Sequence, residues 1–88
     1  MATVKIKAPK KRTFDFEIEG MGKMSAPAFA NFPMERAVEL VGKTDEEVMT
    51  IYMAYLVEQC PELSEIDIET MGTVISEWMR DSGVFAGE

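Results

Sequence analysis

The amino-acid sequence predicts an α+β fold that is mainly α, with an N-terminal β-hairpin followed by three helices. Residues 13–19 alternate strictly between apolar and polar side chains, which is the period-two pattern of a half-buried strand. Three later segments space their apolar residues as helices do, and Pro, Gly or capping residues bound each of them. The chain of 88 residues has room for one domain, which we place at residues 13–88 behind a basic arm at residues 1–12.

The hairpin is expected to use residues 13–19 as its first strand and residues 23–26 as its return strand. Acidic side chains alternate with apolar ones along the first strand, so one face would be buried and the other solvated. Gly20-Met21-Gly22 is expected to form the turn, because glycine adopts a positive φ without strain. The buried face would consist of Phe14, Phe16 and Ile18.

A first short helix is expected over residues 34–41. Pro33 stands where a helix can begin, since the first turn does not need an N–H from it. Gly42 follows as the C-terminal stop. The side chains expected to point inward are Ala37, Val38, Leu40 and Val41.

The second helix carries the clearest start signal in the chain. In Thr44-Asp45-Glu46-Glu47, the Thr44 hydroxyl can accept from the Glu47 N–H while the Glu47 carboxylate reaches back, which forms a capping box. Three acids in the first turn also favour the positive end of the helix dipole. Pro61 ends the helix. The apolar stripe consists of Val48, Ile51, Tyr52, Tyr55, Leu56 and either Gln59 or Cys60.

The last helix has two candidate N-caps, Asp67 and Ser64, and Gly83 is expected to close it. Gly72 lies in the middle of this helix, where glycine costs up to about 1 kcal/mol relative to alanine. We interpret this glycine as the mark of a close helix contact. The apolar stripe consists of Ile68, Met71, Val74, Ile75, Trp78 and Met79.

Charge divides the chain into two parts. Residues 1–12 carry a local charge of +5, whereas residues 13–88 carry −12. An acidic domain repels a phosphate backbone, which argues against nucleic-acid binding by the domain itself. We interpret the arm as a solvated terminal segment, with contact to RNA, DNA or an acidic protein face as the alternative. Val4 and Ile6 alternate with lysines, so an extra edge strand is a further alternative.

Cysteine usage and hydropathy indicate where the protein acts. Cys60 is the only cysteine, so no intramolecular disulfide can form and a reducing compartment is the default. No apolar run approaches the ~18 residues of a membrane span. No hydrophobic stretch follows the basic N-terminus, so a secretory signal is not expected. The expected location is the cytoplasm.

The residue types that carry catalysis are scarce. Histidine is absent, which removes the commonest general base and metal ligand near neutral pH. One cysteine without histidine gives neither a Cys–His nucleophile pair nor a zinc site. No Gly-rich phosphate-binding loop occurs, and residues 62–69 lack the oxygen-rich loop that calcium needs. We therefore expect no enzymatic activity, no catalytic residue, no cofactor and no metal.

An apolar content of 47%, including eight methionines, is high for so small a domain and indicates contact with other proteins. Methionine on a helix stripe usually fills a core, but its thioether chain also adapts to different partners. A tryptophan is likewise core or interface anchor. The candidate protein-binding residues, which the core interpretation also fits, are Met49, Tyr52, Met53, Tyr55, Trp78 and Met79.

The order of these features resembles the short tail assembly chaperones of long-tailed phages with flexible tails. The resemblance runs from about residue 13 to the end of the sequence. It rests on the strand ending in Gly20, the Pro27–Pro33 segment leading into Met34-Glu35-Arg36-Ala37, and the amphipathic middle helix. Its most specific part is the helix carrying Trp78, followed by Ser82-Gly83-Val84 and a final Gly87-Glu88. Family members often have Leu before that glycine, where this chain has Ala86.

The resemblance implies a chaperone made in the host cytoplasm during late infection. Such proteins bind the long, aggregation-prone tape measure protein. An extended form made by ribosomal frameshifting brings in tail tube subunits, and the chaperones leave before the virion is complete. We also expect self-association into a homo-oligomer. Two alternatives are an acidic inhibitor that imitates nucleic acid or blocks a host protein, and a small regulatory or structural dimer with its basic arm on RNA.

Overall fold

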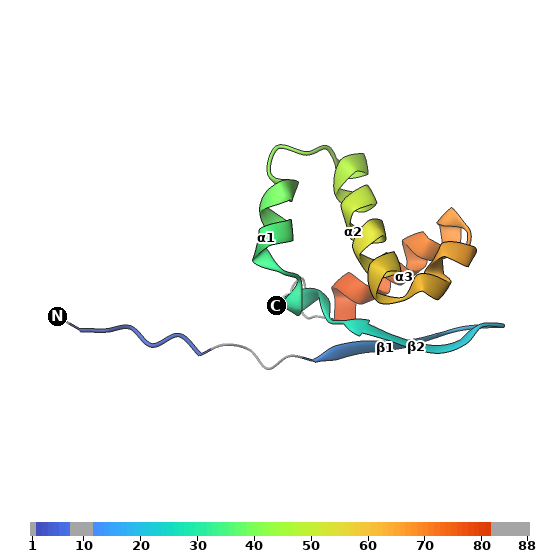
Figure 1. The fold of residues 1–88 in the computed structure, drawn as a ribbon, viewed down its shortest axis with the longest axis horizontal. Coiled ribbons are helices and arrows are strands. Elements are labelled where there is room, and N and C mark those ends of the chain that lie inside the picture. The colour runs from blue at the N-terminus through green and yellow to red at the C-terminus, as the bar shows by residue number, and fades with distance from the viewer. Residues whose placement is uncertain (1, 8–11, 82–88) are drawn as a thin grey trace.

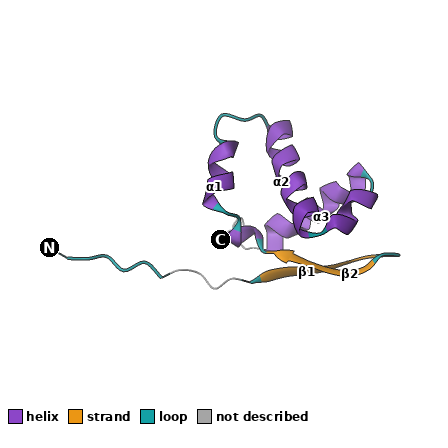
Figure 2. Ribbon diagram, viewed as in Figure 1, coloured by secondary structure: helices purple, strands orange, loops and turns teal. Residues whose placement is uncertain are grey.

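A β-hairpin lies along one side of a group of helices, and residues 2–7 extend away from the hairpin (Figure 1). The computed structural model describes residues 2–7 and 12–81. Two strands precede the helices in the chain (Figure 2), so the predicted fold class is confirmed. The elements are β1 (Thr13–Ile18), β2 (Gly22–Pro27), the 3-10 helix η1 (Phe29–Asn31), α1 (Met34–Ala37), the 3-10 helix η2 (Val38–Leu40), α2 (Asp45–Gln59), the 3-10 helix η3 (Pro61–Glu65) and α3 (Ile68–Asp81).

The hairpin is antiparallel and forms where the alternating pattern predicts it. Gly20 and Gly22 have φ values of 88° and 95°, which are the left-handed conformations that a tight turn requires. The turn is closed by the Met21 N–H, which donates to the Ile18 carbonyl at 2.9 Å. Phe14 is buried against the helices, and the acids of β1 are exposed.

The first helical segment begins after Pro33 as predicted, but only Met34–Ala37 is α-helical. The next three residues tighten into η2, and Gly42 ends the segment with a φ of 77°. The loop after Gly42 leads into α2, which runs beside α1 in Figure 1.

The prediction that Val38 and Val41 point inward is wrong. Their side chains are 58% and 81% exposed, whereas Ala37 and Leu40 are half-buried. Val38 begins η2, and Val41 lies beyond it in extended backbone, so the continuous helical stripe that would have carried both valines inward does not form.

Helix α2 begins with the predicted capping box. The Glu47 N–H donates to Thr44 Oγ1 at 3.2 Å, and the Thr44 N–H donates to Glu47 Oε1 at 2.9 Å. The helix ends at Gln59, and Pro61 begins η3.

Helix α3 is capped by Asp67, whose Oδ1 accepts from the Thr70 N–H at 2.8 Å; the alternative cap, Ser64, lies inside η3. The predicted stripe is buried or half-buried except for Ile68, which is the first residue of the helix and is 79% exposed. A Cβ added at Gly72 would meet nothing within 4 Å, so the interpretation of a close helix contact there is wrong. The predicted stop at Gly83 lies outside the described residues.

The core is built around Trp78, whose side chain is fully buried. Its Nε1–H donates to the Pro27 carbonyl at 2.8 Å, which fixes α3 to the end of β2. The ring centroids of Phe29 and Tyr52 lie 4.9 Å and 5.5 Å from that of Trp78, both in edge-on geometry. This aromatic cluster joins the hairpin, η1, α2 and α3, and the interpretation of Trp78 as a core residue is confirmed.

Residues 2–7 belong to no strand or helix, so the extra edge strand is not formed within this chain. Val4 and Ile6 are 80% and 88% exposed. Arg12, by contrast, is tied to the domain. Its backbone N–H donates to Asn31 Oδ1 at 3.1 Å and its Nη2 donates to the Asp81 carbonyl at 2.9 Å. Arg12 is therefore held to the domain, whereas residues 2–7 are not.

Candidate protein-binding surface

An apolar groove lies between α2, η3 and α3, and we call it the helix groove. Its volume is about 590 Å³. Most of the surface that lines it is apolar, and two carboxylates, those of Glu58 and Asp67, stand among its lining residues. The lining residues are Thr50, Met53, Ala54, Val57, Glu58, Leu63, Ile66, Asp67, Ile68 and Met71.

Local sequence signals shape this groove. Pro61 cannot continue α2 and starts the short 3-10 helix η3. Leu63, only 1% exposed, anchors η3 to the core. Asp67 then starts α3, so the chain changes direction twice within ten residues. The result is a depression between helices, with Leu63 and Met71 buried at its base and Ile68 exposed at its rim.

The two carboxylates that line the helix groove also form hydrogen bonds that stabilise the fold. Both oxygens of Glu58 accept from Arg36 Nη2, at 2.6 Å and 2.8 Å, which ties α2 to α1. The hydrogen bonds from Thr70 lower the pKa of Asp67 below its usual value, so this carboxylate stays ionised at the start of α3. A partner in the groove would therefore meet an apolar floor beside fixed negative charge.

The structure separates the predicted binding residues into three groups. Tyr52, Tyr55 and Trp78 are buried at 7%, 5% and 0% exposure and form part of the core. Met49 and Met79 are half-buried against that core. Met53 alone among the six candidates lines the helix groove.

Sequence reasoning missed the groove residues contributed by η3 and the start of α3. Ile66 lies in a segment for which no helix was predicted, and Val57 was outside the predicted stripe of the second helix. Ile68 was assigned to the apolar stripe of the last helix, but not to a groove. The signal that could have indicated them is the spacing of apolar residues between acids in residues 62–69.

A second exposed apolar surface lies on α1 and η2. Met34, Val38 and Val41 are 74%, 58% and 81% exposed. These side chains are spread along one short segment and do not line the helix groove. The helix groove is therefore the better formed of the two surfaces.

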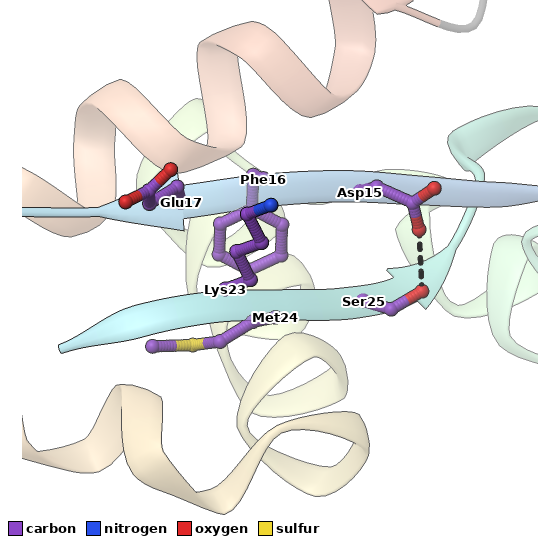
Figure 3. A pocket seen from close by; sticks show the side chains of 6 residues that line it. All are labelled: Asp15, Phe16, Glu17, Lys23, Met24 and Ser25. Atoms are coloured by element: carbon purple, nitrogen blue, oxygen red, sulfur yellow. Dashed lines mark hydrogen bonds between the residues drawn. The ribbon is translucent and has the colours of Figure 1, made fainter.

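A depression of about 570 Å³ on the hairpin is lined by Asp15, Phe16, Glu17, Lys23, Met24 and Ser25 (Figure 3). Asp15 Oδ1 accepts from Ser25 Oγ at 2.7 Å and from Thr13 Oγ1 at 3.0 Å. These bonds lower the pKa of Asp15, so the group remains a carboxylate and is not poised as a general acid near neutral pH. Among residues 2–7 and 12–81 no cluster of acids or cysteine has the arrangement of a metal site.

Cys60 is buried, and its Sγ–H donates to the Ser25 carbonyl at 3.0 Å. Burial raises the pKa of this thiol, so it is protonated near neutral pH and is a structural residue in this fold. In the described part of the chain, no helix has the length and apolar character needed to cross a membrane.

No protein-family model matches this sequence, and no curated protein or solved structure matches it either. The function therefore has to be argued from the surfaces described above.

Proposed function

We propose that this chain is a protein-binding domain that acts by covering apolar surface on a partner, without catalysing a reaction. Within that class, we propose a phage tail assembly chaperone that binds and solubilises the tape measure protein. The observation that supports the proposal most directly is the helix groove, an apolar depression on a domain of strongly negative charge.

The groove suits an amphipathic helix as its occupant. In helix-in-groove recognition, apolar side chains at positions i, i+3, i+4 and i+7 of the partner enter a cleft between helices. Met53 and Met71 supply adaptable thioether contacts, which allow one groove to accept several turns of a long partner. Leu63 supplies a rigid floor.

The charge of the domain supports the same function. A net charge of −12 over residues 13–88 keeps a complex with an aggregation-prone partner in solution, because like charge opposes further association. The acids of the described residues are distributed among helix caps, the exposed face of β1 and the Arg36 ion pair. An inhibitor that imitates nucleic acid needs its acids on one continuous face, so this distribution favours the chaperone.

The proposed client is the tape measure protein, with the tail tube protein as the partner recruited later and the host cytoplasm as the place of action. The resemblance described above and the helix groove support this assignment together. A long helical client with apolar stripes requires a soluble cover during assembly, and the domain offers one.

Co-expression with the tape measure protein encoded nearby tests the proposal. We expect the wild-type chain to raise the soluble fraction of that protein and to co-purify with it. Ile68→Gln combined with Met53→Gln should abolish both effects, because the two substitutions place amides on the rim and floor of the groove. Thermal unfolding of the double variant shows whether the domain is still folded.

Val41→Gln is the matched control, since Val41 is as exposed as Ile68 but lies outside the groove. This variant should solubilise the client like the wild type. A wild-type chain that neither solubilises nor co-purifies with the client would overturn the chaperone proposal. Loss of binding in Val41→Gln alone would instead move the binding surface to η2.

A further inference from the structure

The two strands of the hairpin differ in how their outer edges are covered. The outer edge of β2 is occupied by helices, since the Ser25 carbonyl accepts from Cys60 Sγ–H and the Pro27 carbonyl accepts from Trp78 Nε1–H. In an antiparallel pair, opposite residues point their backbone groups alternately toward and away from each other. Asp15 and Thr13 face Ser25 and Pro27 in the register, so their own N–H and C=O groups also point outward.

The outer edge of β1 therefore presents unpaired backbone groups. The pattern continues to Glu17. Outside the β1–β2 ladder, no hydrogen bond described for residues 2–7 and 12–81 uses a backbone group of Thr13, Asp15 or Glu17. An open strand edge of this kind is a template for an added strand. Because helices cover the outer edge of β2, only the outer edge of β1 can pair with an added strand.

A groove of about 370 Å³ runs between this open edge and α3, and we call it the edge groove. Its apolar lining comes from Phe14, Phe16 and Ile18 on β1 and from Val74 on α3. Glu17, Glu19 and Glu77 also line it, and no basic residue does. An occupant of matching chemistry is an extended segment with apolar residues at alternate positions and basic residues between them.

Residues 2–7 of the same sequence have this chemistry. Val4 and Ile6 alternate with Lys5 and Lys7, and the segment is extended, with both apolar side chains almost fully exposed. Figure 1 shows the segment directed away from the hairpin, so it does not fill the edge groove of its own chain. We propose that it pairs with β1 of a second copy, so that two chains exchange their N-terminal segments.

The pairing follows from sheet geometry. When Val4 and Ile6 share the inner face with Phe14 and Phe16, they enter the edge groove, and the lysines fall on the outer face beside Asp15 and Glu17. A shift by one residue would place lysine in the apolar groove, so the face that the segment turns toward the groove is determined. Two chains related by a two-fold axis each give one segment and receive one, which closes the assembly as a dimer. This dimer does not depend on the proposed chaperone activity.

Sedimentation of the wild-type protein over a range of concentrations should show a reversible dimer. Val4→Gln combined with Ile6→Gln should weaken it about tenfold or more, because the anchoring side chains are lost. Met34→Gln combined with Val38→Gln is the control, because it also removes two exposed apolar side chains but lies elsewhere, and it should dimerise like the wild type.

The receiving side is tested with Thr73→Arg, which places a bulky cation in the edge groove from an exposed position of α3. Ser76→Arg, exposed on the same helix outside the groove, is its control. At a concentration where the wild type is mostly dimeric, the arm variant (Val4→Gln combined with Ile6→Gln) and Thr73→Arg should each be mainly monomeric. An equimolar mixture of the arm variant and Thr73→Arg should recover dimers, because one intact arm then meets one intact groove.

Recovery in the mixture would establish exchange between copies. A wild-type protein that stays monomeric, or a dimer unaffected by the arm substitutions, would overturn the proposal. If the two monomeric variants form no dimer when mixed, the proposal is also overturned, because residues 2–7 of one chain then do not pair with β1 of another.

Discussion

At the scale of single residues, Trp78 links η1, α2, α3 and β2. It is fully buried, contacts aromatic rings from η1 and α2, and donates its N–H to β2. We predict that Trp78→Ala lowers the free energy of unfolding by about 3–5 kcal/mol. A domain of this size has a stability near the low end of about 5–15 kcal/mol, so the variant should be largely unfolded.

Chemical denaturation followed by circular dichroism measures this loss. Trp78→Phe keeps an aromatic ring but removes the donor to the Pro27 carbonyl, and it should cost less than the alanine variant. A Trp78→Ala protein with wild-type stability would contradict the position of this residue in the core.

Three buried groups make stability sensitive to alkaline pH. Burial raises the pKa values of Cys60, Tyr52 and Tyr55 above their usual 9.0, 10.0 and 10.0. As pH rises, the unfolded chain loses these protons first, so it binds fewer protons than the folded chain. The free energy of unfolding should therefore fall as pH rises above about 9 and continue to fall until the folded groups ionise.

Urea unfolding at a series of alkaline pH values tests this prediction. Cys60→Ala removes one contributor and should flatten the first part of the decline. A free energy of unfolding that is constant or rises across this range would contradict the assigned direction of the pKa shifts.

At the scale of elements, α3 contains a glycine, Gly72, that lowers the stability of the helix and can be replaced. Gly72 has space for a Cβ, and its φ is not in the left-handed region. We predict that Gly72→Ala stabilises the domain by about 0.5–1 kcal/mol, because alanine loses less backbone entropy in a helix. Gly42→Ala is the control with the opposite expected sign, since Gly42 has a φ of 77°. Paired thermal unfolding measures both, and a destabilising Gly72→Ala would contradict the open space seen there.

The elements also show how far sequence reasoning reaches. Caps, turns and long apolar stripes act locally, so the hairpin, the start of α2 and the end of α2 at Pro61 were all predictable. The inward assignment of Val38 and Val41 was wrong because a switch from α to 3-10 winding depends on how the segment packs. That packing is not encoded in the periodicity of eight residues.

The candidate site was less predictable than the fold. An apolar stripe on a helix identifies residues that avoid solvent. It does not show whether they are buried in the core or line a surface groove. Tyr52, Tyr55 and Trp78 point into the core because hairpin and helices meet there, while Met53 lies at the margin where α2 and α3 diverge. Only the arrangement of these elements decides which methionine lines the helix groove.

At the scale of the whole molecule, the chain consists of a domain and an arm whose boundary can be located by truncation. Deletion of residues 2–7 should leave cooperative unfolding of the monomer unchanged, because Val4 and Ile6 make no contact that buries them. Deletion of residues 2–12 should lower the melting temperature, because it removes the hydrogen bonds of Arg12 to Asn31 and Asp81. Melting temperatures measured below the dimerisation range compare the two, and equal stability of both deletions would contradict a role for Arg12 in the domain.

The position of Trp78 has a spectroscopic consequence. It is the only tryptophan in the sequence and is shielded from water, with two tyrosine rings centred 5.5 Å and 6.0 Å from its own. Its emission should lie at short wavelength and should be fed by energy transfer from those tyrosines. Because Trp78 lines neither the helix groove nor the edge groove, its fluorescence reports unfolding and stays constant when a partner occupies either surface. Intrinsic fluorescence and light scattering recorded on one sample therefore separate loss of the fold from loss of binding.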